Sequence, residues 1–328
     1  MFDLVAQRTH EDYQRFVRYW EYAAEKSLKT QDVADEFGIS LRSANFYRRD
    51  AEKVMGLVLP SLGGRSPQAK ALPRLEHYSV GGKKKIRSII ASDWHIWPGE
   101  QSFAEKVFLK TLETHKFDYV ILNGDVLDLP SVSRHAPLPG EHKPSVTDEI
   151  EEAKLRVAEV EKRAGRAKRL YVWGNHDERL DKMLAKQMPS LDGFGGVSVE
   201  EMFPKWTFCL SMDIHERVVI KHSWHTSMHA AFNNTRYSGK TVITGHTHRL
   251  LVRPYSDYTG TRYGIETGTL ADPHGPQFRY AENNPRDWHP GFLIMETELY
   301  DDGAFDVRPQ LVDCTLRKPV VLGEAVRM

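Results

Sequence analysis

Side chains that can bind metal ions follow five short apolar runs of the sequence. The runs IIAS, YVILN, YVW, VVIK and VIT each end directly before Asp, Asn or His side chains, or one glycine before them. In chain order these polar sites are DWH at 93–95, GDVLD at 124–128, GNHD at 174–177, the single His222, and GHTH at 245–248. Carboxylate, amide and imidazole groups are ligands that together suit manganese, iron or zinc. An Asp can also bridge two ions, and paired ions ~3.5–4 Å apart are the usual arrangement for displacement at phosphorus.

Each apolar run is typical of a short strand, and helical patterns near 101–115 and 147–169 separate the early runs. This alternation predicts a layered α/β or α+β domain. If the strands lie side by side in a sheet, their polar ends converge on one rim. The glycines before Asp125, Asn175 and His246 allow tight turns directly after a strand.

The ordered set DxH, GDxxD, GNHD, H and GHTH resembles the calcineurin-like metallophosphoesterase family, in its DNA-repair-exonuclease-like and phage-type form. The resemblance covers most of residues 86–328. Five motifs in the family's order are far more specific than any one of them alone. The resemblance implies a layered β-sandwich flanked by helices and a metal-dependent hydrolase that acts on phosphate esters.

The resemblance also implies two divalent metal ions and their ligands. The first ion would be held by Asp93, His95, Asp125 and His248, and the second by Asp125, Asn175, His222 and His246. Asp125 would bridge them. Manganese is the expected metal, with iron, zinc, nickel or magnesium as alternatives. A hydroxide bridging the ions is the expected nucleophile, because coordination lowers the pKa of water.

The isolated histidine has two candidate positions in the sequence. The family often has Gly after this residue, whereas the sequence here reads KHSWHTSMH. His222 is preferred because it lies directly at the strand end, and His225 is its substitute.

The resemblance assigns His176 to the scissile phosphate, where it would stabilise the transition state or protonate the leaving oxygen. Asp128 would orient the His176 ring, since a carboxylate on the far ring nitrogen selects the tautomer. In the segment SVSRH, Arg134 and His135 are candidates to contact the substrate phosphate, because guanidinium forks suit phosphate. GDxxD is followed by Leu129 and not by the Arg typical of protein phosphatases, which disfavours a Ser/Thr phosphatase.

Residues 1–55 are predicted to form a small all-α domain. An amphipathic helix from His10 to about Leu28 precedes two short helices joined at Gly38-Ile39-Ser40. The stretch TQDVADEFGIS resembles a helix-turn-helix. Its recognition helix would cover residues 41–49, and the side chains able to reach DNA are Arg42, Ser43, Asn45, Arg48 and Arg49. The apolar residues of this stretch would be needed in the core of any three-helix bundle, whether or not the bundle binds DNA. The alternative is therefore a bundle that docks on protein.

Residues 56–85 are predicted to be a linker, and residues 86–328 the phosphoesterase domain. The chain has 45 Lys and Arg against 45 Asp and Glu, so no global field favours nucleic acid or membranes. Two cysteines are too few for a disulfide framework, which favours the cytoplasm, or the host cytoplasm if the chain is phage-encoded. No apolar run approaches the ~18 residues of a membrane span, so no membrane partner is expected.

Three functions remain open from the sequence. The first is a phosphodiesterase acting on nucleic acid, a DNA nuclease or exonuclease to which the front domain supplies DNA affinity. The second is a phosphomonoesterase acting on a nucleotide, another small molecule or a phosphoprotein. The third is a DNA-binding or scaffold protein with an inactive phosphoesterase fold.

Overall fold

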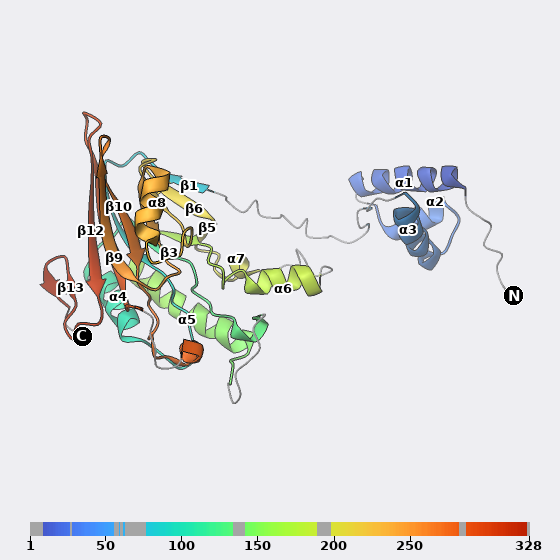
Figure 1. Ribbon diagram of the computed structural model, residues 1–328. Helices are drawn as coiled ribbons and strands as arrows, with labels where there is room; N and C mark the ends of the chain where they lie inside the picture. Colours follow the sequence, from blue (N-terminus) through green and yellow to red (C-terminus); the bar gives the residue numbers. More distant parts are fainter. Residues whose placement is uncertain are drawn as a thin grey trace. The chain divides into compact units, whose positions relative to one another are not determined.

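The computed structural model describes residues 9–26, 28–55, 59, 62, 77–133, 142–188, 198–281 and 287–326. The chain divides into two compact units, Met1–Lys70 and Ala71–Met328. Figure 1 shows the helices and strands of both units and labels many of them. Within the described ranges no helix is both long and apolar enough to cross a membrane.

The smaller unit is built from helices that share one apolar core. Its helices are α1 (His10–Glu25), α2 (Thr30–Glu36) and α3 (Leu41–Met55). Helical spacing buries Phe16 and Trp20 on one side of α1, and the ring of Phe16 stacks on Tyr47 of α3 with centroids 4.1 Å apart. Ser40 Oγ accepts a hydrogen bond from the N–H of Ser43 at 3.1 Å and so caps α3. The helical region predicted at the front of the chain is therefore present.

The larger unit contains two six-stranded mixed sheets. The strands of the first sheet, in spatial order, are β1 (His77–Val80), β6 (Ser211–Ile214), β7 (Val218–Ile220), β8 (Thr241–Thr244), β10 (Gly260–Thr267) and β9 (Leu250–Asp257). The strands of the second sheet are β12 (Phe305–Asp313), β11 (Gly291–Leu299), β2 (Lys85–Ala91), β3 (Tyr119–Asn123), β4 (Lys168–Val172) and β5 (Thr207–Cys209). A ribbon of β13 (Val320–Val321) and β14 (Glu324–Ala325) lies near the end of the chain.

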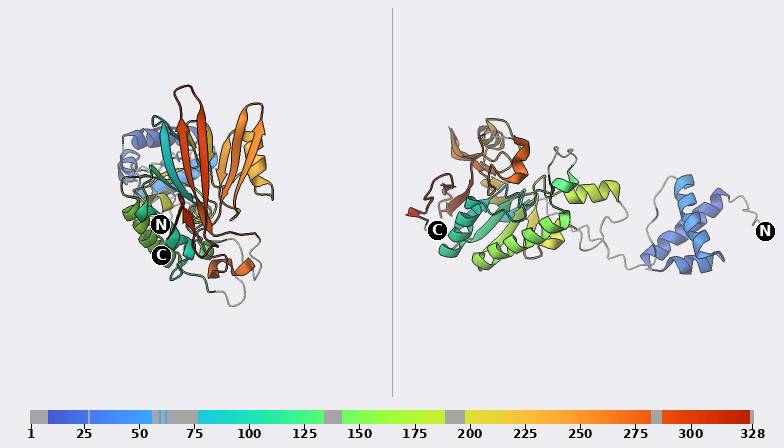
Figure 2. Two further views of the ribbon diagram at one scale, coloured as in Figure 1. Left: turned by 90° about the vertical axis from the view of Figure 1, so that its left-hand side faces the viewer. Right: turned by 90° about the horizontal axis from the view of Figure 1, so that it is seen from below.

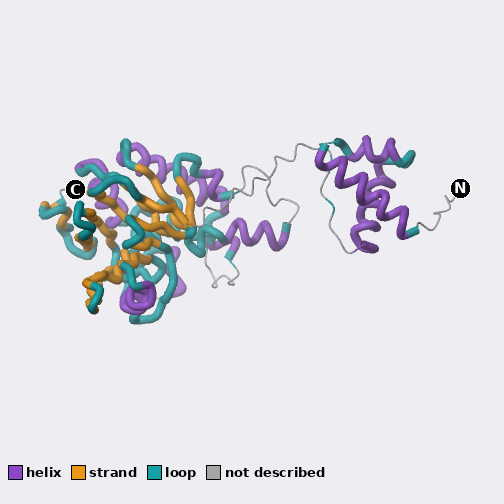
Figure 3. Tube along the Cα trace, turned by 90° about the horizontal axis from the view of Figure 1, so that it is seen from above, coloured by secondary structure: helices purple, strands orange, loops and turns teal. Residues whose placement is uncertain are grey.

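The two sheets pack face to face, with helices outside them. Ile90 of β2 belongs to the core between the sheets, together with Ile121 and Ile243, whereas its neighbour Ile89 belongs to the core that contains helical side chains. The helices are α4 (Phe103–Thr114), α5 (Val146–Ala164), α6 (Arg179–Gln187), α7 (Val199–Met202) and α8 (Ala230–Ser238), with short turns η1 (Pro130–Val132) and η3 (Pro276–Ala281). In Figure 2 (left), α5 and α8 lie on opposite outer sides of the strands, and Figure 3 shows strands between helices. The predicted mixed α/β sandwich flanked by helices is confirmed.

The five apolar runs belong to two sheets and not to one. β2, β3 and β4 are neighbours in the second sheet, while β7 and β8 pair in the first. The expectation that all five lie side by side is therefore wrong. Strands buried on both faces are apolar throughout, so their pattern does not say which strand pairs with which.

β1 lies within residues 56–85, the segment predicted to be a linker. It pairs in parallel with β6, with Ser79 opposite Asp213, and the Ser79 hydroxyl donates to Asp213 Oδ2 at 2.9 Å. β1 therefore belongs to the larger unit. Its four residues are half polar, which explains why the sequence pattern shows no strand there.

Candidate metal centre

The loops that follow β2, β3, β7 and β8 are joined to one another by backbone hydrogen bonds. The N–H of Asp93 donates to the carbonyl of Gly124 at 2.9 Å, the N–H of His95 donates to Asp125 at 3.0 Å, and the N–H of Gly245 donates to His222 at 2.9 Å. The N–H of His246, after β8, also donates to Asp93 Oδ2, after β2, at 2.9 Å, so loops from both sheets contribute to one site. The face-to-face packing of the sheets brings the predicted polar residues together.

Several site residues have a left-handed backbone, which is rare and costly for non-glycine residues. The positive φ values are 53° at Asp93, 42° at His95, 52° at Asp125, 69° at His246 and 58° at His248. Such conformations persist where the surrounding structure holds them and concentrate at functional sites. The strain at these residues is consistent with a site selected for function.

Two groups made only of predicted ligands have the composition and spacing of metal sites; a third group, His95 with Asp128 and His176, shares His95 with the first. Asp93, His95 and His248 form one group, and Asp125, His222 and His246 form the other; within each group the potential ligand atoms lie within 4.8 Å of one another. In the first, His248 Nε2 lies 3.2 Å from Asp93 Oδ1 and 3.2 Å from His95 Nε2. In the second, His222 Nε2 lies 3.1 Å from Asp125 Oδ2. These six residues are six of the seven predicted ligands.

The seventh predicted ligand, Asn175, lies in the turn between β4 and α6 with an exposed side chain. The next residue, His176, donates its N–H to Asp125 Oδ1 at 2.8 Å, so the turn is held against the second group. The substitute ligand His225 lies elsewhere. Its ring lies 5.2 Å from Trp224 and 5.3 Å from Tyr237, measured between centroids, and it belongs to none of the groups found among the described residues.

The buried carboxylates of the site favour a bound cation. Burial raises the pKa of Asp125, but His222 and His176 outweigh burial and hold this pKa well below its usual range. Burial lowers the pKa of His222, but Asp125 outweighs it and raises that pKa to about 10. The buried carboxylates therefore need nearby positive charge, which protonated imidazole or a bound divalent ion can supply. His222 Nδ1 donates to the carbonyl of Asn123 at 2.7 Å, which directs Nε2 toward Asp125.

His176 and Asp128 lie together, as the sequence predicts. His176 Nδ1 donates to Asp128 Oδ1 at 2.8 Å, and the same oxygen lies 3.0 Å from His95 Nδ1. Arg179, at the start of α6, was not identified from the sequence. Its Nη2 donates to His176 Nε2 at 2.9 Å and its Nη1 donates to the carbonyl of Asp128 at 2.6 Å. A guanidinium group therefore lies beside the candidate proton donor.

Asp177, the last residue of GNHD, supports the loop after β3. Its carboxylate accepts five hydrogen bonds, from the N–H groups of Asp125, Val126, Leu127 and Gly174 and from the hydroxyl of Tyr171. The motif itself was the signal that could have revealed this role. Because Asp177 is fully buried, its hydrogen bonds hold the backbone of Asp125 in place.

Glu149 of α5 supports the next part of the same loop. Its Oε1 accepts from the N–H of Asp128 at 2.6 Å and from the N–H of Leu129 at 2.7 Å. Leu129 has a φ of 50°, so this acceptor stabilises a strained turn. No local signal in the sequence links Glu149 to this turn, because the residue lies about twenty positions away on a helix.

Glycines allow the loops to pack closely. A Cβ on Gly124 would lie 2.4 Å from His222 Nδ1, and a Cβ on Gly174 would lie 2.1 Å from the backbone nitrogen of Asp125. These glycines let neighbouring loops approach each other closely, in addition to allowing the tight turns predicted from the sequence.

Aromatic side chains cover one side of the first metal group. Phe278 of η3 lies 5.1 Å from the His95 ring and 5.2 Å from the His248 ring, and Trp288 lies 4.7 Å from the His248 ring, measured between centroids. An apolar wall lowers the local dielectric and strengthens charge interactions at the site.

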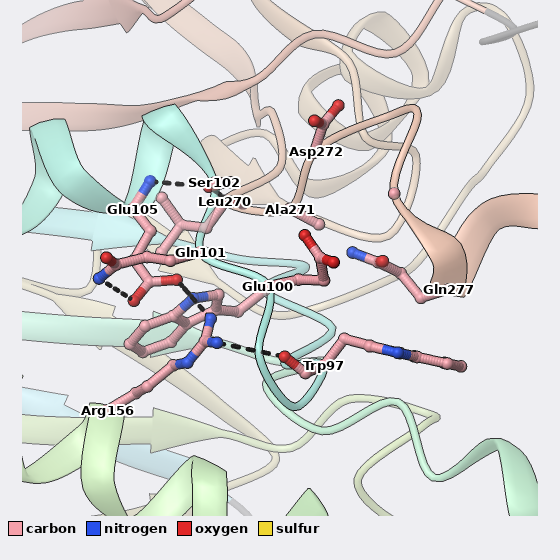
Figure 4. A pocket seen from close by; sticks show the side chains of 12 residues that line it. Trp97, Glu100, Gln101, Ser102, Glu105, Arg156, Leu270, Ala271, Asp272 and Gln277 are labelled. Atoms are coloured by element: carbon pink, nitrogen blue, oxygen red, sulfur yellow. Dashed lines mark hydrogen bonds and ion pairs between the residues drawn. The ribbon is translucent and has the colours of Figure 1, made fainter. Parts of the chain in front are cut away.

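A small polar pocket adjoins the loop after β2 (Figure 4). Glu105 lines the pocket, and its Oε2 accepts from Arg156 Nη1 at 2.7 Å and from Trp94 Nε1 at 3.0 Å. Arg156 Nη2 also donates to the carbonyl of Trp97 at 3.1 Å. These contacts join α4 and α5 to the loop that carries the first metal group, and we assign the pocket a structural role.

The remaining predicted contacts are placed only in part. Arg134 and His135 lie outside the described residues. On α3, the side chains of Arg42, Asn45 and Arg49 are exposed. Ser43 Oγ instead lies 2.8 Å from Ser40 Oγ, and the Arg48 guanidinium lies over the Trp20 ring at 5.8 Å. These last two side chains have contacts within their own bundle.

Comparison with known proteins gives a family match and weaker individual similarities. The model of the Calcineurin-like phosphoesterase superfamily domain matches residues 86–281. The Gene 54 proteins of Mycobacterium phages D29 and L5 are each 26% identical over 249 residues, which cover 69% of this chain and 92% of theirs.

Among solved structures, a Vps29 single mutant from Entamoeba histolytica is 17% identical, covers 70% of this chain and 99% of its own, and has a TM-score of 0.34. An archaeal phosphodiesterase is 15% identical, covers 69% of this chain and 100% of its own, and has a TM-score of 0.33. YfcE, a phosphoesterase from E. coli, is 11% identical, with coverages of 68% and 98% and a TM-score of 0.32.

Proposed function

The chain belongs to the calcineurin-like phosphoesterase superfamily, and from this premise we propose that it is a two-metal phosphodiesterase that cleaves DNA. The observation that carries the proposal is the convergence of two Asp–His–His groups from loops of both sheets. Family membership supports metal-dependent hydrolysis of phosphate esters. The number of metals and the DNA substrate are our proposals.

The ligand sets follow from the two groups. Asp93, His95 and His248 would hold one ion, and Asp125, His222 and His246 the other, with Asn175 completing the second set and Asp125 shared. Bound divalent ions supply Lewis acidity at the phosphoryl group and lower the pKa of coordinated water. Manganese suits this mixture of carboxylate, imidazole and amide ligands.

His176 is proposed to hold the proton for the leaving oxygen. Its Nδ1 is occupied by Asp128, so Nε2 is the atom that can give a proton to the substrate. Burial lowers the pKa of His176, but Asp125 and Asp128 outweigh burial and raise it. Arg179 donates to this same Nε2, so Arg179 must shift before Nε2 can carry a proton. The guanidinium is then placed to bind the substrate phosphate, because its fork suits phosphate oxygens.

DNA is proposed as the substrate because of the front unit. Its helix-turn-helix-like bundle exposes Arg42, Asn45 and Arg49 on α3, and such side chains reach phosphates or base edges in proteins of this kind. A second candidate is a phosphomonoesterase whose front unit docks on protein. It is favoured by Phe46 of α3, whose side chain is 64% exposed, since exposed aromatic side chains are common at protein interfaces.

The test is hydrolysis of bis-p-nitrophenyl phosphate and p-nitrophenyl phosphate with and without Mn²⁺, in parallel with labelled single- and double-stranded DNA. Asp125→Ala and His176→Ala should abolish or strongly reduce diester and DNA cleavage. Asp301→Ala is the matched control, because this carboxylate is exposed on the turn after β11. Turnover of the monoester alone would refute the nuclease and favour a docking role for the front unit. DNA binding without any hydrolysis would favour the scaffold function.

A further inference from the structure

One continuous part of the larger unit carries basic residues at the ordinary density of the chain but has no acidic residue. Residues 217–256 contain six Lys or Arg residues and no Asp or Glu, although the whole chain has 45 of each kind. The six are Arg217, Lys221, Arg236, Lys240, Arg249 and Arg253. Arg249 pairs with Glu266 at 3.0 Å. Lys221 and Arg236, within the described parts of the chain, have no carboxylate within 4.0 Å.

Two of these cations lie over exposed aromatic rings. The Lys221 ammonium lies 5.6 Å from the centroid of Trp224, and the Arg236 guanidinium lies 5.7 Å from that of Tyr237. The His225 ring lies between the two aromatic rings, stacked on Trp224 at 5.2 Å with an interplanar angle of 22° and 5.3 Å from Tyr237. We call these five residues the aromatic strip. Trp224 is 42% exposed and Tyr237 is 62% exposed, so both rings can be reached from solvent.

The aromatic strip begins next to a predicted metal ligand in the chain. Lys221 directly precedes the predicted ligand His222, and Trp224 follows two residues later. The loop is held in place at both ends: the N–H of His225 donates to the buried Asn234 Oδ1 at 3.0 Å, and Arg249 Nη2 donates to the carbonyl of Ser227 at 2.7 Å. Because Arg249 directly follows His248, the loop is attached to segments that carry ligands of both groups.

We propose that the aromatic strip binds single-stranded nucleic acid and leads the strand to the metal centre. Bases stack on Trp224 and Tyr237, and Lys221 and Arg236 contact the neighbouring phosphates. Non-sequence-specific single-strand sites combine these two features, since every base has a face that can stack and every linkage has a charge. A duplex keeps its base faces covered, so exposed rings favour an unpaired strand. Cleavage of that strand rests on the proposed function, whereas binding does not.

The experiment measures binding by fluorescence anisotropy, using the full chain, labelled oligothymidine of about 20 nucleotides, and EDTA to prevent cleavage. Trp224→Ala and Tyr237→Ala should each raise Kd about 5-fold or more, because stacking of one base is worth ~1–3 kcal/mol. Tyr258→Ala is the matched control, since this tyrosine is fully exposed in the β9–β10 turn of the same unit. Lys221→Gln and Arg236→Gln should each lower the slope of log K against log salt by about 0.7.

Hydrolysis of bis-p-nitrophenyl phosphate with Mn²⁺ by the same variants should match that of the wild type, which separates loss of strand binding from loss of the metal centre. If the wild type binds the oligonucleotide and the strip variants do not, the strip is established even if no DNA is cleaved. Equal Kd values for wild type, Trp224→Ala and Tyr237→Ala would overturn the proposal. A wild type that ignores the oligonucleotide but forms a dimer that Trp224→Ala dissociates would also overturn it, in favour of a protein interface.

Discussion

Replacing Glu149 by Gln should stabilise the protein at alkaline pH and not at acidic pH. Glu149 is fully buried, and its Oε1 accepts from the N–H groups of Asp128 and Leu129. Its Oε2 is buried without a hydrogen-bond partner among the described residues. Gln keeps the accepting oxygen and replaces only the unpartnered one. The substitution therefore removes a buried charge and leaves the turn supported.

The size of the effect follows from the pKa. Burial raises the pKa of Glu149 from 4.5 to about 8. The folded protein thus holds this proton more tightly than the unfolded chain does, so wild-type stability falls as pH rises from about 4.5 to about 8. At 1.36 kcal/mol per pH unit, the fall has a ceiling of about 5 kcal/mol. The free energy of unfolding of Glu149→Gln should not fall in this way as the pH rises.

The assay is urea denaturation at pH 5 and pH 9, read as the free energy of unfolding. The difference between Glu149→Gln and wild type should grow in favour of the variant by several kcal/mol from pH 5 to pH 9. Glu151→Gln is the control, because Glu151 is an exposed acid on the same helix. A difference that stays within about 0.5 kcal/mol between the two pH values would refute a neutral buried Glu149.

Three further perturbations test the supports of the site. Asp177→Asn should lower the free energy of unfolding by about 1–3 kcal/mol at pH 8. In one of the two orientations of the Asn side chain, its N–H₂ group would face the backbone N–H groups of Asp125 and Gly174, which leaves those donors without an acceptor. An unchanged urea midpoint would contradict this expectation. Arg179→Gln should lower kcat/KM for bis-p-nitrophenyl phosphate about 10-fold or more, and Arg179→Lys should restore only part of the lost activity. If both variants have the kinetics of the wild type, the role of Arg179 is structural. Mn²⁺ at about 100 times its Kd should stabilise the wild type by about 2.7 kcal/mol in thermal melting and Asp125→Ala by much less; an equal rise in both would place the ion elsewhere.

The candidate metal ligands could be recognised from the sequence because their signal is local. A carboxylate or imidazole directly after an apolar strand is visible without knowing where the strand lies, as with Asp93 after β2 and His246 after β8. The order of the five motifs added the family resemblance and the expected partition into two ligand sets. The helices of the smaller unit could also be predicted locally, because the cap at Ser40 and the turn at Gly38 involve neighbouring residues.

Other features depend on contacts between residues that are distant in sequence. His222 lies beside Asp125, with its Nε2 3.1 Å from Asp125 Oδ2, although the two residues are far apart in the chain. Likewise, Glu149 supports the Leu129 turn from α5, and no periodicity predicts that contact.

The sequence by itself determined which side chains could bind metal and that strands would deliver them to loops. Only the tertiary structure decided that these strands lie in two sheets, that β1 extends the first sheet into the predicted linker, and that Trp224 and Tyr237 line one surface beside the site. The physical reason is that an apolar run buried on both faces is the same in either sheet. Strand pairing and side-chain neighbours are set by packing across the core, which the local pattern does not encode.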